Sequence, residues 1–180
     1  MDNDKLRKII RTVPDWPKPG VNFFDICSIV EEPAAFAWTV NRLAVACGAH
    51  DTSAIVSPDA RGFLWGSAIA FSTKLPMHLA RKPGKLPGEV VTQKYDYEYS
   101  SGSISLQAGS ALSGKRVMII DDVLATGGTA LAIVDLLTSH FGVPAEDIHL
   151  GAVINLPFLG GATKLKERGI QITSLLDYHE

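Results

Sequence analysis

The sequence predicts a single α/β domain, in which a twisted, mainly parallel sheet is flanked by helices on both faces. Segments with the apolar pattern of buried strands alternate with segments whose apolar residues recur at helical spacing, and such alternation favours a parallel sheet. The chain has 180 residues, of which 46% are hydrophobic and 20% are charged, as in one globular domain. No repeat or linker divides it, so we expect residues 1–180 to form one unit.

Apolar residues at Leu6, Ile9, Ile10 and Val13 predict a short amphipathic helix at the start of the chain. A proline-rich turn ends this helix, and an apolar, partly extended stretch follows. Pro33 suits the first turn of the next helix. The later elements are expected as helices at 34–47, 63–71, 130–137 and 162–168 and as strands at 54–57, 77–80, 104–107, 117–120, 149–155 and 172–176.

Residues 81–103 interrupt this alternation. They begin with a basic stretch rich in glycine and proline and continue with polar and aromatic residues of β character. They end in a run of serine and glycine that we expect to be flexible. Long insertions in compact domains commonly carry function, so we predict a mobile hairpin that acts as a lid over the sheet.

The composition excludes several classes of function. The net charge is −2 without a polybasic run, so we expect neither nucleic acid nor a membrane surface as a partner. No apolar run approaches the about 20 residues of a membrane-spanning helix, and the first residues do not form a signal peptide. Cys27 and Cys47 lack metal-ligand spacing, so we expect buried or half-buried thiols in a reducing cytoplasm.

The most informative stretch is residues 117–130. Four apolar residues precede Asp121 and Asp122, and a loop of threonine and glycine then leads into a helical pattern. Such a loop opens a helix, where free N–H groups and the helix dipole favour a phosphate. The two carboxylates would repel a bare phosphate, so they should face sugar hydroxyls or Mg²⁺ instead. A phosphorylated ribose offers both a phosphate and hydroxyls.

Four cations follow two other predicted strands. Arg61 lies in the turn after one strand, and Arg81, Lys82 and Lys85 come after the next. The carboxyl ends of parallel strands meet at one edge of a sheet, and the threonine-glycine loop lies at that same edge. A group of up to four cations there would suit a diphosphate.

Residues 117–129 resemble the signature with which type I phosphoribosyltransferases bind 5-phosphoribosyl diphosphate (PRPP). Segments at 14–21, 59–63, 81–87 and 97–99 are similar to the adenine branch of this family, so the similarity covers nearly the whole chain. The resemblance implies a type I phosphoribosyltransferase-like fold and a role in purine salvage. The implied reaction transfers the phosphoribosyl group from PRPP to adenine, giving AMP and diphosphate, with Mg²⁺ as cofactor and a homodimer as the assembly.

The resemblance also implies roles for individual residues. Phe23 would stack on adenine in a base-binding segment that includes Asn22 and Phe24, and we expect one of the two phenylalanine rings to lie in the core. Glu98 would exchange a proton with the base, and Arg61 is the second catalytic candidate. The implied PRPP-binding residues are Arg61, Arg81, Lys82, Lys85, Tyr99, Asp121, Asp122, Ala125, Thr126, Gly127, Gly128 and Thr129.

Two further features follow from the resemblance. Mg²⁺ would be bound mainly through PRPP without a direct protein ligand, and Asp121 or Asp122 would reach it through water. The peptide bond between Asp59 and Ala60 would be cis and would present a backbone N–H to diphosphate.

The base-binding segment departs from the family in two places. Phe24 stands where the family usually has arginine, and Asn22 stands where it often has an aliphatic residue. If side chains there select the base, another purine such as xanthine is the alternative substrate. A non-catalytic PRPP-sensing regulator on the same fold is the other alternative, but the charge of −2 and the short N-terminal helix argue against nucleic-acid binding.

Overall fold

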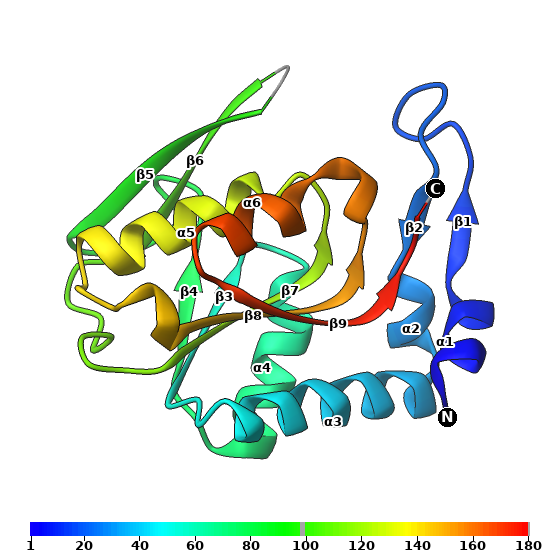
Figure 1. Cartoon of the computed structure of the whole chain (residues 1–180), viewed down its shortest axis with the longest axis horizontal. Helices are drawn as coiled ribbons and strands as arrows, with labels where there is room; N and C mark the ends of the chain where they lie inside the picture. Colours follow the sequence, from blue (N-terminus) through cyan, green and yellow to red (C-terminus); the bar gives the residue numbers. More distant parts are fainter. Residues whose placement is uncertain (98–99, 180) are drawn as a thin grey trace.

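A computed structural model shows one α/β domain and describes residues 1–97 and 100–179 (Figure 1). Its central sheet has five strands, all parallel, in the order β4-β3-β7-β8-β9. The strands are β3 (Ala54–Pro58), β4 (Met77–Ala80), β7 (Val117–Leu124), β8 (Ile148–Asn155) and β9 (Gln171–Asp177). The expected parallel sheet is confirmed, and β7 occupies its centre.

Helices cover both faces of this sheet (Figure 1). The helices α3 (Pro33–Ala49) and α4 (Gly62–Thr73) pack on one face, and α5 (Gly128–Ser139) and α6 (Gly161–Glu167) on the other. Successive side chains of a strand point to opposite faces, so β7 supplies both cores. Val117 and Ile119 join the cluster under α5, whereas Met118 joins the cluster under α3 and α4.

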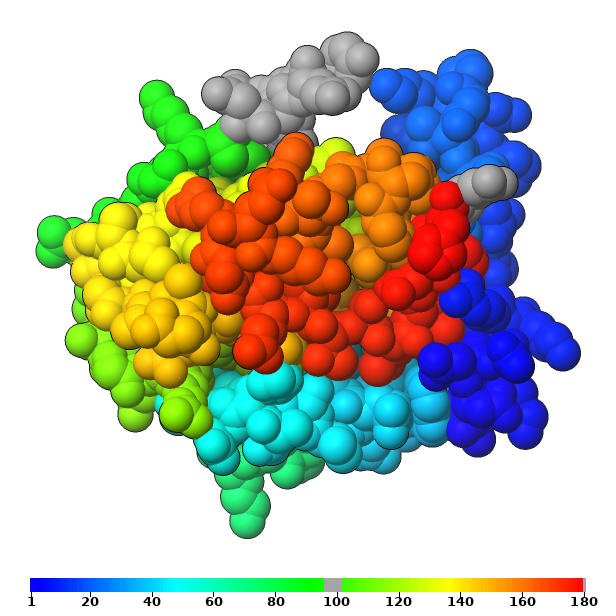
Figure 2. All heavy atoms as spheres, in the orientation of Figure 1, coloured from blue at the N-terminus to red at the C-terminus, as the bar shows by residue number. Residues whose placement is uncertain are grey.

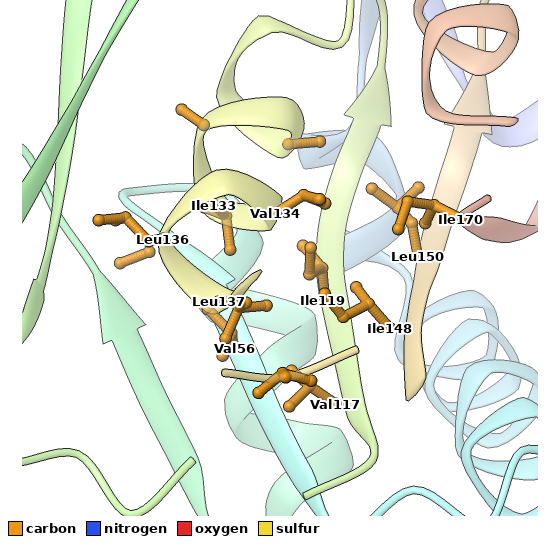
Figure 3. Packing of buried hydrophobic residues seen from close by; sticks show 14 of the residues in the cluster. Val56, Val117, Ile119, Ile133, Val134, Leu136, Leu137, Ile148, Leu150 and Ile170 are labelled. Atoms are coloured by element: carbon orange, nitrogen blue, oxygen red, sulfur yellow. The ribbon is translucent and has the colours of Figure 1, made fainter. Parts of the chain in front are cut away.

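The cluster under α5 holds the helix that follows the central strand. Figure 3 shows Ile133, Val134 and Leu137 of α5 pointing toward Ile119 and Val117. Ile119, Ile133 and Leu137 are completely buried. Burial of such aliphatic side chains contributes about 1.5–3 kcal/mol each, and it holds α5 against β7.

A separate antiparallel hairpin consists of β5 (Val90–Tyr97) and β6 (Ser100–Gln107). The N–H of Arg81 donates to the carbonyl of Ser105, and the N–H of Ser105 donates back, so the hairpin begins beside the end of β4. A hairpin is therefore present, whereas its mobility and its role as a lid stay predictions, and residues 104–107, expected as a separate strand, form its last part. Residues 100–103, expected as a flexible run, belong to β6, which is one strand through Gln107. Pairing with β5 places them in a strand despite their serine and glycine content.

The N-terminal prediction was wrong beyond residue 10. Helix α1 (Asn3–Ile9) is followed by β1 (Arg11–Val13), which pairs with β2 (Phe23–Asp25). Val13 pairs opposite Phe23 and is exposed, so its helical spacing was coincidental. Figure 2 shows this N-terminal segment in blue at one edge of the molecule, with α6 in orange covering the centre of the visible face.

The remaining elements are short. They are α2 (Cys27–Glu31), η1 (Ala145–Asp147) and η2 (Pro157–Leu159). Cys47 is buried as expected, but Cys27 is exposed, because it opens α2 at the surface. Among the described helices none is long and apolar enough to cross a membrane.

Candidate active site

A cavity of about 240 Å³ lies at the carboxyl ends of the central strands. Its lining comes from residues 58–61 at and after the end of β3, from residues 121–130, which span the last part of β7, the following loop and the start of α5, and from Leu150. It therefore brings Arg61 together with predicted residues that lie sixty or more positions later in the chain. These are Asp121, Asp122, Ala125, Thr126, Gly127, Gly128 and Thr129.

The phosphate loop, defined here as residues 125–129, joins β7 to α5. Gly127 has a φ of +80°, a left-handed conformation that glycine adopts without the penalty of a Cβ atom. This turn starts α5 at Gly128, and none of the described side chains caps the helix. The first N–H groups of a helix have no intrahelical acceptor, so they are available to an anion in the cavity.

The two adjacent carboxylates differ in their surroundings. Asp122 is only 3% exposed, and its Oδ2 lies 2.9 Å from Nε of Arg61. No residue in the described part of the chain donates a hydrogen bond to Asp122 Oδ2, so this contact is an ion pair without hydrogen-bond geometry. The Asp121 Oδ1 atom instead accepts the backbone N–H of Asp122 at 2.9 Å.

The surroundings of Asp121 favour its protonated form. Burial, followed by the charge of the neighbouring Asp122, raises the pKa of the Asp121 carboxyl well above its usual value, and Arg61 only partly opposes this. Gly62 opens α4 beside this group, and a Cβ on Gly62 would lie 3.1 Å from Asp121 Oδ1. The close approach of α4 thus restricts the space around the carboxyl.

The other predicted cations lie outside the cavity lining. Arg81 donates from Nε to Asp59 Oδ2 at 2.9 Å and from Nη1 to the carbonyl of Lys85 at 3.0 Å. Lys82 and Lys85 are exposed in the turn that follows β4. The peptide between Asp59 and Ala60 is cis, as expected. The Arg81–Asp59 pair therefore links the turn after β4 to the segment that lines the cavity.

An aromatic group stands beside Arg61. The ring of Phe23 is half-buried, and its centroid lies 4.3 Å from the centroid of the Trp16 ring. The Arg61 guanidinium lies 5.5 Å from the centroid of the Phe23 ring. The ring of Phe24 points the other way into the core and contacts Tyr178 at 4.0 Å between centroids. The expectation of one inward ring is met, and Asn22 is exposed.

Two predicted site residues cannot be placed, and one neighbour of the site was not predicted. Glu98 and Tyr99 lie outside the described residues. Trp16 was not predicted as part of the site, because nothing in its local sequence shows that it contacts Phe23. Thr129 Oγ1 contacts the hydroxyl of Tyr95 at 3.4 Å, which places the hairpin next to the phosphate loop.

The cavity combines a helix N-terminus, two carboxylates and an arginine at the edge of a parallel sheet, which is the arrangement expected for a phosphorylated sugar. Residues 28–157 match the family model for the phosphoribosyl transferase domain. The chain therefore belongs to the phosphoribosyltransferase family.

Within this family the chain is similar to adenine phosphoribosyltransferases. The enzyme of that name from Marinobacter nauticus is 38% identical over 98% of this chain and 96% of its own length. The structure of adenine phosphoribosyltransferase from Thermoanaerobacter pseudethanolicus is 35% identical, has a TM-score of 0.88, and is matched over 98% of this chain and 99% of its own. The structure from Giardia lamblia complexed with 9-deazaadenine has a TM-score of 0.92 at 30% identity, over 100% of this chain and 99% of its own.

Proposed function

We propose that this protein is a purine-salvage enzyme that transfers the 5-phosphoribosyl group from PRPP to adenine, giving AMP and diphosphate. The observation that carries the proposal is the cavity in which the phosphate loop, Asp121, Asp122 and Arg61 meet. The relatives named adenine phosphoribosyltransferase, which match nearly the full chain, support adenine as the base. The Giardia lamblia enzyme, solved with 9-deazaadenine, supports it further.

The residues around the cavity would divide the substrate among them. The N–H groups of residues 125–129 would bind the 5′-phosphate, and Asp121 and Asp122 would accept hydrogen bonds from the ribose hydroxyls. Arg61, with Arg81, Lys82 and Lys85 from the neighbouring turn, would bind the diphosphate. Negative charge develops on the departing diphosphate, so these cations stabilise the transition state more than the ground state.

The residues present also fit Mg²⁺, although the described residues contain no cluster of three or more acidic, histidine or cysteine side chains that could hold a metal alone. Magnesium commonly keeps several waters and binds through one or two carboxylates plus substrate phosphates. Asp121 is half-buried, and the buried Oδ2 of Asp122 has no hydrogen bond from the described residues. Either could reach a PRPP-bound Mg²⁺ through water. The ion would neutralise charge on the diphosphate.

Base binding is assigned to the segment that includes Asn22, Phe23 and Phe24. The half-buried Phe23 ring is the group available for stacking, whereas the Phe24 side chain is occupied in the core. Phe24 would therefore contribute through its backbone. This arrangement favours selection of adenine by backbone groups. The unusual side chains at positions 22 and 24 would then leave the preference for adenine unchanged.

The hairpin of β5 and β6 would act as the lid. Closure over the cavity would exclude water, which otherwise would hydrolyse PRPP. Glu98 and Tyr99 are assigned to this closed state, with Glu98 exchanging a proton with the base. The contact between Thr129 and Tyr95 of β5 supports a hairpin that meets the phosphate loop.

The proposal extends to a cytoplasmic homodimer. Phe71 is 89% exposed and Leu64 is 40% exposed, and the two lie seven positions apart, on one side of α4. Exposed large apolar side chains on one helix face are typical of a protein interface. A second copy of this chain is the partner that we assign to this face.

The decisive test is base-dependent release of diphosphate from PRPP, with adenine, hypoxanthine, guanine and xanthine in competition. We expect adenine to be consumed first and AMP to be the main product. If xanthine were consumed first, the substrate would be xanthine and not adenine. Binding of PRPP without diphosphate release for any base would indicate the regulator instead.

A further inference from the structure

The phosphate loop rests on the start of α6, an element that follows it by thirty residues in the chain. The N–H of Gly161 donates to the carbonyl of Ala125 at 3.1 Å, and the N–H of Leu156 donates to the carbonyl of Leu124 at 2.9 Å. These two bonds connect the segment between β8 and α6 to the end of β7. The backbone of the loop is thus held by two residues, Leu156 and Gly161, that do not line the cavity themselves.

Gly161 lies closer to the loop than any other residue type could. A Cβ on Gly161 would lie 2.2 Å from the carbonyl oxygen of Ala125, 2.6 Å from the nitrogen of Gly127 and 2.8 Å from the carbonyl carbon of Thr126. In the opposite direction, a Cβ on Gly127 would lie 2.9 Å from Cα of Gly161. All of these atoms belong to the backbone, so no side-chain rotation could relieve the overlap.

The adjacent Gly160 is present for a different reason. Its φ is +76° and a Cβ there would meet nothing within 4 Å, so its requirement is conformational. Gly161 is not in the left-handed region, so glycine is required there only because the loop backbone lies so close to it. Of the two adjacent glycines, only Gly161 touches the phosphate loop.

We infer that Gly161 is a positioning residue for the phosphate loop: it sets where the N–H groups of residues 125–129 stand without touching the substrate itself. The identity of the ligand as a sugar phosphate rests on the proposed function. Helix α6 is anchored in the core through Leu165, which is completely buried, whereas the loop lines the cavity. A side chain at position 161 would therefore displace the loop backbone and with it the N–H groups that line the cavity.

The direct test is Gly161→Ala, compared with Gly109→Ala. Gly109 also lacks a positive φ, and a Cβ there would meet nothing within 4 Å, so it controls for the loss of a glycine. Binding of PRPP and of ribose 5-phosphate is measured by calorimetry. We expect Gly161→Ala to weaken both ligands at least tenfold, with circular dichroism unchanged, and Gly109→Ala to match the wild type. Wild-type affinity for both ligands in Gly161→Ala would overturn the inference.

A second pair of variants keeps the inference testable if Gly161→Ala does not fold. Leu165→Ala loosens α6 beneath the loop, and Leu43→Ala removes an equally buried leucine from the core on the opposite face. At a temperature where both are folded, we expect only Leu165→Ala to bind ribose 5-phosphate several-fold more weakly. Equal affinities in the two variants would count against a role for α6.

These measurements separate the inference from the proposed function. Ribose 5-phosphate binding needs neither a base nor catalysis. If the wild type binds this probe but releases no diphosphate with any purine, the proposed reaction fails while the role of Gly161 is still decided by its own variants.

Discussion

Arg61 Nε and Asp122 Oδ2 lie 2.9 Å apart in the cavity lining, where Arg61 immediately precedes α4 and Asp122 belongs to β7. The cation assigned to diphosphate thus pairs with a carboxylate assigned to the ribose. Asp122 is buried whereas Arg61 is half exposed, so removal of Arg61 would leave a buried carboxylate without its partner, which is costly. The two residues should therefore respond to mutation as a coupled unit.

Asp122→Asn should weaken PRPP binding. A hydrogen bond to a charged group contributes about 1.5–3 kcal/mol, so the dissociation constant should rise roughly ten- to hundredfold. Asp51→Asn is the matched control, because Asp51 also pairs with an arginine at 2.9 Å but lies on the surface away from the cavity. Equal PRPP affinity in the two variants, measured by calorimetry, would show that Asp122 is only structural.

PRPP affinity should depend on pH through Asp121. Its pKa is raised by burial and by Asp122, so part of the carboxylate becomes protonated as the pH falls toward the raised value. The protonated form accepts hydrogen bonds less well, so affinity should decrease with falling pH in the wild type. Asp121→Asn should bind PRPP more weakly at neutral pH, and its affinity should change less than that of the wild type as the pH is lowered. Parallel pH profiles for the two proteins would contradict this role.

The neighbours Phe23 and Phe24 should give opposite results. Stacking of a base on an aromatic ring contributes about 1–3 kcal/mol, so Phe23→Ala should raise the KM for adenine roughly five- to hundredfold with little loss of stability. Phe24→Ala removes a buried ring and should lower the free energy of unfolding by about 3–5 kcal/mol. Its KM for adenine should stay near that of the wild type. A stable Phe24→Ala enzyme with a high KM for adenine would reverse the two assignments.

Glu98→Gln tests the proton transfer assigned to the lid. General acid–base catalysis typically contributes about 10²–10⁴-fold, so the single-turnover rate should fall by that factor while PRPP still binds. A drop of roughly tenfold or less would correspond to the loss of one hydrogen bond that anchors the lid. Single-turnover measurement is needed, since slow product release can hide the chemical step in kcat. A rate equal to that of the wild type would remove Glu98 from the catalytic residues.

His149 should make the fold sensitive to acid. It is buried, stacks on His50 at 3.6 Å between ring centroids, and its Nε2 lies 2.9 Å from Thr173 Oγ1. Burial, and then the neighbouring His50, lowers the pKa of His149 to about 4. The unfolded chain therefore binds the proton more tightly, and stability falls as the pH drops from about 6.5 toward 4.

From pH 7.5 to 5 this single histidine should cost about 2 kcal/mol of unfolding free energy. Urea unfolding of the wild type and of His149→Gln at both pH values checks this. The variant should lose less stability between the two conditions. His140→Gln, at an exposed position, should behave like the wild type. An unchanged pH dependence in His149→Gln would show that His149 does not carry the effect.

Local sequence was sufficient to predict the structure at the centre of the molecule. The strand that contains Asp121 and Asp122 and the helix that starts after Gly127 are consecutive in the chain, so their order alone placed the phosphate loop at the edge of the sheet, although the strand runs to Leu124 and not to residue 120 as expected. Arg61 could be placed near it because parallel strands end at one edge.

Features that depend on distant pairing could not be read in the same way. Val13 has helical spacing to Leu6 and Ile9, and only its pairing with Phe23 makes it part of a strand. Gly161 follows another glycine, but its contact with Ala125 exists only in the folded chain. The exposure of Cys27 likewise depends on where α2 sits and not on the neighbouring residues.

The contact between Trp16 and Phe23 gives this protein an intrinsic optical probe. Trp16 is half exposed beside the assigned base site, whereas Trp65 is completely buried and donates its indole N–H to Thr39. Replacing Trp38 and Trp65 with phenylalanine would leave Trp16 as the single tryptophan, whose emission responds to a ring stacked close by. Occupancy of the base site could then be followed in real time by fluorescence quenching, without a labelled substrate.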